Sequence, residues 1–192
     1  MVLQFNTLIC SSFFGLGVTA SYGLTLQLFT LLIAVCGTAY QTLQPEINQS
    51  CLHHDNETTI KLISFGSLFN WIIYLVGFLI IIFFGPKVID LLNVEVELLH
   101  TNLILFMGLY LFLENNHSMF ASYITGQNKI PFVKASLFSG FFVVLLSMFS
   151  VYFTSYGLLG LMISQALVQL CYNNWKWPYD IVVKYQLSFN II

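Results

Sequence analysis

The sequence predicts an all-α integral membrane protein, on the evidence of its composition and of the spacing of its polar segments. Hydrophobic residues make up 58% of the 192 positions and charged residues only 7%, and the mean hydropathy is +0.84. A soluble domain of this length needs many more polar side chains to cover its surface. Long apolar runs separated by short polar stretches therefore predict a bundle of membrane-spanning helices.

We predict five full spans and one partial helix. Prolines and glycines mark the limits of the apolar runs, and Pro45 and Pro86 are expected to end the first and the second span. Residues 1–14 reach only ~21 Å as a helix and lead into the turn-like segment 15–23, so we expect them to be the end of a truncated helix. The predicted spans are residues 22–44, 61–85, 98–124, 131–153 and 157–172.

The lysines predict the orientation of the bundle. Counting loops alternately along the chain places Lys61, Lys129, Lys134, Lys176 and Lys184 at one end, and only Lys87, with three acidic residues, at the other. Cytoplasmic loops of membrane proteins carry an excess of lysine and arginine. We therefore expect the loops 45–60 and 125–130 and the tail 181–192 to be cytoplasmic, and the loop 86–97 to face outside.

The strongest functional candidate is a polar run within the third predicted span, formed by Glu114, Asn115, Asn116 and His117. A charged side chain near the membrane centre costs on the order of 3 kcal/mol to insert, and such residues mark ion or substrate pathways. Glu114 and His117 are three residues apart and so share a helix face. The run suits either a titrating site that couples proton movement to transport, or an array that binds sugar hydroxyls. The alternative is that it fixes this helix to a neighbour.

Small and polar residues form stripes along the other spans. Packing explains the serine and glycine stripes better than a pathway does, because small residues let membrane helices approach closely. Larger amides need hydrogen-bonding partners when buried, so Gln27 and Gln41 in the first span and Asn70 in the second are candidate neighbours of Glu114. Ser147 and Gln165 lie on the looser stripes of the last two spans.

Three segments resemble the C-terminal half of the flippases that move O-antigen and polysaccharide repeat units. They are LENNHSMFASYITGQNKIPFVKASLFSG, ASYGLTLQLFTLL with its continuation to Pro45, and ALVQLCYNNWKWPYD. These flippases belong to the multidrug, oligosaccharidyl-lipid and polysaccharide exporter superfamily, whose fold is similar to that of the MATE exporters. The resemblance covers residues 12–180. It implies that residues 1–180 form one six-helix lobe, with the N-terminal lobe missing or supplied by a second chain.

The function that this resemblance implies is translocation of undecaprenyl-pyrophosphate-linked oligosaccharides across the bacterial inner membrane for surface polysaccharide and lipopolysaccharide synthesis. The two lobes of such a transporter rock about a central site, so neither enzyme chemistry nor a cofactor is expected. Lys61 and Lys134 are candidate contacts for the pyrophosphate headgroup, although ordinary anchoring at the cytoplasmic boundary explains them more simply. The chain has no arginine, so the family's cationic cavity is expected in the other lobe.

Other functions stay open at this point. A multidrug or organic-cation antiporter of the same superfamily would use Glu114 as its cation or proton site, and a non-transporting remnant or assembly protein is a further alternative. A membrane-embedded enzyme is disfavoured, because the longest predicted loop, residues 45–59, is too short to carry a catalytic site. His53, His54 and Asp55 lack a well-placed further ligand, so no metal site is expected. The net charge of −2 gives no indication of nucleic-acid binding.

Overall fold

The computed structural model describes residues 2–93, 95–127 and 130–185, and this part of the chain is helical with short connections and no strand. The all-α prediction is confirmed. The helices are α1 (Val2–Phe13), α2 (Gly15–Gln41), α3 (Gln44–Leu52), α4 (Asn56–Leu91), α5 (Thr101–Gly126), α6 (Phe132–Phe153), α7 (Gly157–Cys171) and α8 (Asn173–Tyr185).

Three helical segments of the described chain are long and apolar enough to cross a membrane. They are Gly15–Leu52, which joins α2 and α3, Asn56–Leu91, which is α4, and Phe132–Phe153, which is α6. The protein is therefore best described as a membrane protein, and these segments contain the predicted spans 22–44 and 61–85 and all but the first residue of 131–153. The predicted spans 98–124 and 157–172 are not among these three segments. The polar run from Glu114 to His117 makes α5 less apolar, and α7 is only 15 residues long before the chain bends into α8.

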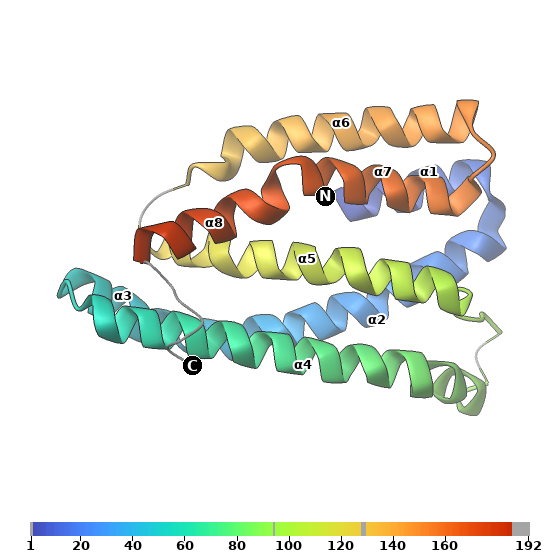
Figure 1. Cartoon of the computed structure of the whole chain (residues 1–192). Coiled ribbons are helices and arrows are strands. Elements are labelled where there is room, and N and C mark those ends of the chain that lie inside the picture. The colour runs from blue at the N-terminus through green and yellow to red at the C-terminus, as the bar shows by residue number, and fades with distance from the viewer. Residues whose placement is uncertain (1, 94, 128–129, 186–192) are drawn as a thin grey trace.

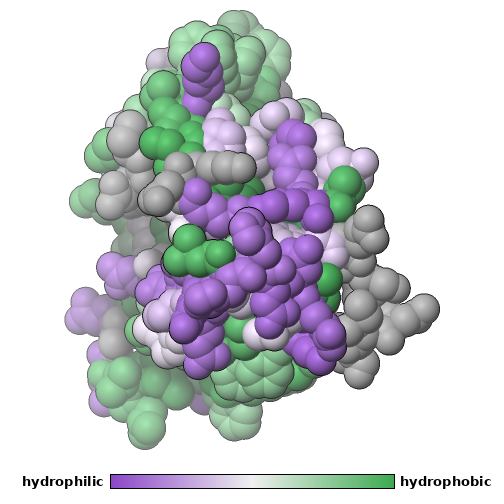
Figure 2. Space-filling model, turned by 90° about the vertical axis from the view of Figure 1, so that its left-hand side faces the viewer, coloured by the Kyte–Doolittle hydropathy of each residue, from purple (hydrophilic) through white to green (hydrophobic). Residues whose placement is uncertain are grey.

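The helices run back and forth along one elongated bundle (Figure 1). One end, which we call the polar end, holds the 53–55 connection and the end of α8 at Tyr185. Seen from this end, hydrophilic residues gather over the surface (Figure 2). The connection between α4 and α5 lies at the opposite end, as the alternation of predicted loops requires. Lys129 lies outside the described residues.

Helix α1 occupies only half of the bundle length. Figure 1 shows it running from the middle of the bundle to the opposite end, where the chain reverses into α2. The reversal takes place at Phe14 and Gly15, and Gly15 has a φ of +81°, a conformation that glycine adopts without steric penalty. Because one glycine makes the turn, the segment 15–23 is the first part of α2 and not the turn that the sequence predicted.

Two other boundaries also differ from the predicted ones. Most of the predicted loop 45–60 is helical, since α3 and the start of α4 leave only residues 53–55 between them. Pro45 lies in the first turn of α3, where its missing N–H leaves no bond unmade. Pro86 lies inside α4, which continues to Leu91, because a proline near a helix end removes a single backbone hydrogen bond.

Two apolar clusters hold the bundle together. The larger lies toward the opposite end, where Tyr22 and Phe29 of α2 pack with Met107 and Leu111 of α5. The smaller lies near the polar end and joins α8 to α5 through Trp177, Ile181 and Met119, among other residues. Side chains on the outside of the bundle are also largely apolar; Leu137 on α6, for example, is 71% exposed. A surface of this kind suits contact with lipid chains.

Asp55 caps the N-terminus of α4 at the polar end. Its carboxylate accepts hydrogen bonds from the Thr58 hydroxyl (2.6 Å) and the Thr58 backbone N–H (3.1 Å), and these bonds hold the pKa of Asp55 below its ordinary value. A lowered carboxyl pKa means that the cap is fully present above the ordinary pKa and is lost as the pH falls through the lowered one.

We expect Asp55→Ala to increase hydrogen exchange in the first turn of α4 at neutral pH, because the cap is removed. After correction for intrinsic rates, the exchange of the wild-type turn should rise on acidification, whereas that of the variant should not. Asp90→Ala, at the far end of the same helix, is the matched control. Equal protection of this turn in the wild type and Asp55→Ala would contradict the assignment of the cap.

Candidate functional site

A chain of hydrogen-bonded polar side chains crosses the middle of the bundle and ends at Glu114. The Ser147 hydroxyl donates to Asn6 Oδ1 (3.2 Å), Asn6 Nδ2 donates to Gln165 Oε1 (2.8 Å), and Gln165 Nε2 donates to Glu114 Oε2 (3.5 Å). Asn6, Ser147 and Gln165 are fully buried. These residues come from α6, α1, α7 and α5, so the chain connects four helices. We call these four residues the polar chain.

Every bond in the polar chain has its donor on the side away from Glu114. The dipoles therefore add, and together they favour a negative charge on the Glu114 carboxylate. An ionised carboxylate only accepts hydrogen bonds, whereas a protonated one also carries a donor. Protonation of Glu114 therefore changes the hydrogen bonding at the end of the polar chain, which links four helices.

Asn115 and Asn116, which follow Glu114 in the sequence, both contact α4. Asn115 is buried and donates from Nδ2 to Asn70 Oδ1 on α4 (3.2 Å), and Asn116 Oδ1 accepts a bond from Trp71 Nε1, also on α4 (2.8 Å). Successive residues of a helix lie 100° apart, so the polar run does not form a single array. Its two asparagines bind α5 to α4, and its carboxylate joins the polar chain. Asn70, predicted as a neighbour of Glu114, thus contacts this run through Asn115.

His117 does not pair with Glu114. No hydrogen bond joins these two described side chains, and His117 Nδ1 is buried without a hydrogen-bond partner in the part of the chain that the structure describes. Asn70 Nδ2 is in the same situation. Buried polar atoms of this kind normally have a partner in protein or water, so each of these two nitrogens can take a further hydrogen bond.

Gln27 and Gln41 are exposed on α2, and neither is hydrogen-bonded to Glu114, whose side-chain partner among the described residues is Gln165. Thr30, Ala34 and Thr38, which belong to the same predicted stripe, are exposed as well. On α5, which packs against α2, Ser118 and Thr125 are exposed between Glu114 and the polar end. We call these seven residues the open polar face. Figure 1 shows that α1 covers only the other half of the bundle.

The two lysines predicted to contact a headgroup differ in their surroundings. Lys61 forms an ion pair with Glu57 one turn earlier on α4, with 2.6 Å between Nζ and Oε1. Lys134 is exposed in the first turns of α6, and no acidic partner is recorded for it among the described residues. Of these two, Lys134 is therefore the cation available to an anionic ligand.

Sequence reasoning missed Asn6 and undervalued Gln165 and Ser147. Asn6 is the central member of the polar chain, but its segment is too short to be a full span, and a lone amide there carries no periodic signal. Gln165 and Ser147 lie on the predicted stripes of the last two spans. Gln165 could have been found from the sequence, because it is a large amide at a position predicted to face other helices. A buried amide requires a hydrogen-bonding partner.

The Asn70 and Asn115 pair permits a direct energetic test. We expect Asn70→Leu and Asn115→Leu each to lower the free energy of unfolding in mixed micelles by about 1–2 kcal/mol, since each leaves a buried amide without its partner. The double variant should recover part of this loss, because it removes both polar groups. Strictly additive losses would show that the two amides do not interact.

Comparison with protein-family models, with curated proteins and with solved structures finds no match to this chain.

Proposed function

We propose that this chain is one lobe of a membrane flippase that translocates lipid-linked oligosaccharide repeat units across the bacterial inner membrane. The observation that carries the proposal is the polar chain ending at Glu114 in the middle of an apolar bundle. Intramembrane carboxylates are rare, and they mark substrate or ion pathways. The substrate class comes from the sequence resemblance to polysaccharide flippases.

In this proposal the open polar face forms one wall of the substrate path. It runs from near the polar end to the level of Glu114. It offers amides, which both donate and accept hydrogen bonds, and threonine hydroxyls, which donate to their own helices and can accept from sugar hydroxyls. A face of this kind is unfavourable against lipid. The N-terminal lobe or a second chain therefore covers it in the working transporter, and the substrate passes between the two walls.

Glu114 has the role of the coupling residue. When it is ionised, the aligned donors of the polar chain hold α1, α5, α6 and α7 in the arrangement described above. Protonation removes the charge that these donors favour and weakens the link between Glu114 and Gln165. The proton therefore shifts the balance between two arrangements of the lobe, which is what alternating access requires.

The polar end is proposed to face the cytoplasm. Lys61, Lys134 and Lys184 belong to this end, whereas Lys87 lies near the other, so the lysine count follows the positive-inside rule. The C-terminus is then cytoplasmic, and the substrate headgroup first meets the lobe at the end where Lys134 is available.

Transport in inverted inner-membrane vesicles tests the proposed function. Vesicles from the bacterium that makes this chain, in which the covering wall is also present, are compared with vesicles from the same bacterium without the chain, using a fluorescent undecaprenyl-pyrophosphate oligosaccharide and, in parallel, the organic cation ethidium. We expect chain-dependent movement of the lipid-linked sugar into the luminal leaflet. Chain-dependent movement of ethidium alone would instead show a cation exporter, and no chain-dependent movement of either would show a non-transporting protein.

A further inference from the structure

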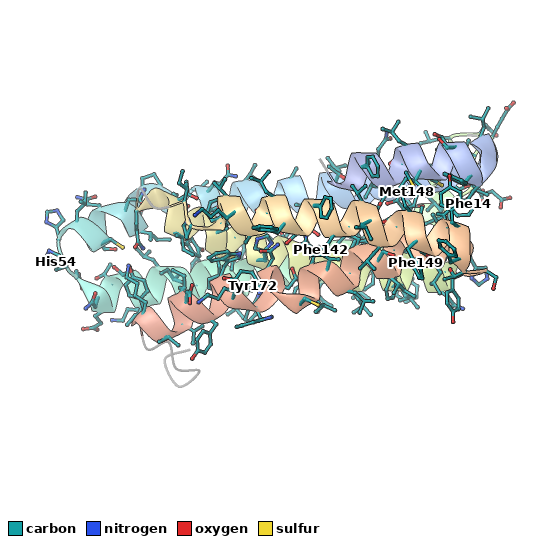
Figure 3. The ribbon with its side chains drawn as sticks, turned by 90° about the horizontal axis from the view of Figure 1, so that it is seen from above. Phe14, His54, Phe142, Met148, Phe149 and Tyr172 are labelled. Atoms are coloured by element: carbon teal, nitrogen blue, oxygen red, sulfur yellow. The ribbon has the colours of Figure 1, made fainter. Side chains whose placement is uncertain are left out.

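An apolar groove of about 550 Å³ lies on the surface between α6 and the C-terminal end of α7. Figure 3 shows Phe142 of α6 and Tyr172, at the junction of α7 and α8, beside each other. The groove is lined mainly by apolar side chains, and the charged residue among its described lining is Lys134, near the polar end. Its principal lining residues are Lys134, Phe138, Phe142, Leu146, Val168 and Tyr172.

The groove is a consequence of the bend between α7 and α8. Tyr172 leaves the helical conformation (φ −145°, ψ −60°), and α8 then turns toward α5, where the Tyr185 hydroxyl accepts a bond from Gln127 Nε2 (3.0 Å). The first half of α6 is left partly uncovered, so that Phe138 is 66% and Phe142 51% exposed. A hydrogen bond from Asn173 Nδ2, at the start of α8, to the Ser139 hydroxyl (2.7 Å) fixes α8 to α6 beside the groove.

The charge at the groove favours an anion. Lys134 lines it, and none of the described acidic side chains does, whereas Lys61 and Lys176 are each paired with an acid on their own helix. A lysine near a membrane surface attracts the phosphate of an anionic lipid. An occupant that is anionic at one end and apolar along its length would satisfy both parts of the groove.

The length of the groove fits one lipid chain. Lys134 and Leu146 are separated by ~18 Å along α6, close to half of a ~30 Å hydrocarbon core. An ordinary acyl chain extends through one leaflet, whereas the polyprenyl chain of a lipid-linked oligosaccharide is much longer. We infer that this groove binds an anionic glycerophospholipid, with its phosphate at the Lys134 ammonium and one acyl chain along Phe138 and Phe142. This site does not depend on the transport function proposed above.

Photocrosslinking of the intact chain in lipid vesicles tests the site. The vesicles contain phosphatidylcholine and a small fraction of phosphatidic acid with a diazirine in its acyl chain, and labelled residues are mapped by mass spectrometry. We expect labelling concentrated on the groove residues of α6 and α7. Lys134→Gln should lower this labelling by about fivefold, while Lys61→Gln, at the same end of the bundle, should leave it unchanged.

A second pair of variants tests the binding of the acyl chain separately from the charge of Lys134. Ala135 also lines the groove, so Ala135→Trp places a large ring in it and should abolish groove labelling even with Lys134 present. Leu137→Trp, at an exposed position outside the groove, should not. Labelling spread evenly over the bundle surface, or labelling unaffected by Lys134→Gln, would overturn the assignment.

Discussion

Glu114→Gln is expected to abolish translocation of the lipid-linked oligosaccharide while leaving the amount of protein in the membrane unchanged. Glutamine has nearly the same size as glutamate and can still bond to Gln165, so the bundle should assemble. It cannot carry a charge or accept a proton, and the coupling step is lost. The measurement is transport of the fluorescent substrate in inverted vesicles, normalised to the amount of inserted chain.

Glu46→Gln is the matched control for this prediction. Glu46 is an exposed carboxylate on α3 at the polar end, so its replacement removes one negative charge without touching the polar chain, and transport should continue. Normal transport by Glu114→Gln would contradict the role of the carboxylate. Loss of transport in both variants would point to a general effect of charge and not to a coupling residue.

Gln165→Leu is expected to destabilise the bundle by on the order of 3 kcal/mol. Gln165 is the only member of the polar chain that bonds to both Asn6 and Glu114, and leucine leaves a buried amide and a carboxylate oxygen without partners. Leucine fits an apolar surrounding, so the loss measures the missing hydrogen bonds more than the packing. The measurement is the free energy of unfolding in mixed micelles.

Two comparisons make the Gln165 result interpretable. Gln49→Leu, at an exposed position on α3, should change the stability by less than about 0.5 kcal/mol. Combining Gln165→Leu with Asn6→Leu should cost less than the sum of the two single changes, because the second replacement removes an amide that has already lost its partner. A Gln165→Leu variant as stable as the wild type would show that the polar chain does not link the helices.

The sequence was sufficient to predict the helical class and the most unusual residue. Composition alone excludes a soluble domain, and a carboxylate in an apolar run is conspicuous whatever it contacts. The boundaries were harder, because they depend on single residues. One glycine at position 15 replaces a predicted nine-residue turn, and Pro86 falls where a helix tolerates it.

The partners of Glu114 could not be predicted, because helix pairing in the bundle is a tertiary property. Periodicity places Gln27, Gln41 and Asn70 each on a face of a helix, but it does not say which face meets which helix. Only Asn70 turned inward to the polar run, whereas the two glutamines face outward. Asn6 escaped detection because α1 is short, and a short helix gives no periodic pattern to interpret.

The most direct test of the account is the water accessibility of α5 within the membrane. In a variant with Cys10, Cys36, Cys51 and Cys171 replaced by alanine, single cysteines are introduced at Ser118, on the open polar face, and at Leu109, an exposed apolar position on the same helix. We predict that a water-soluble thiol reagent modifies the cysteine at 118 in intact vesicles and does not modify that at 109. A cysteine at 118 as unreactive as that at 109 would contradict a water-filled path leading to Glu114.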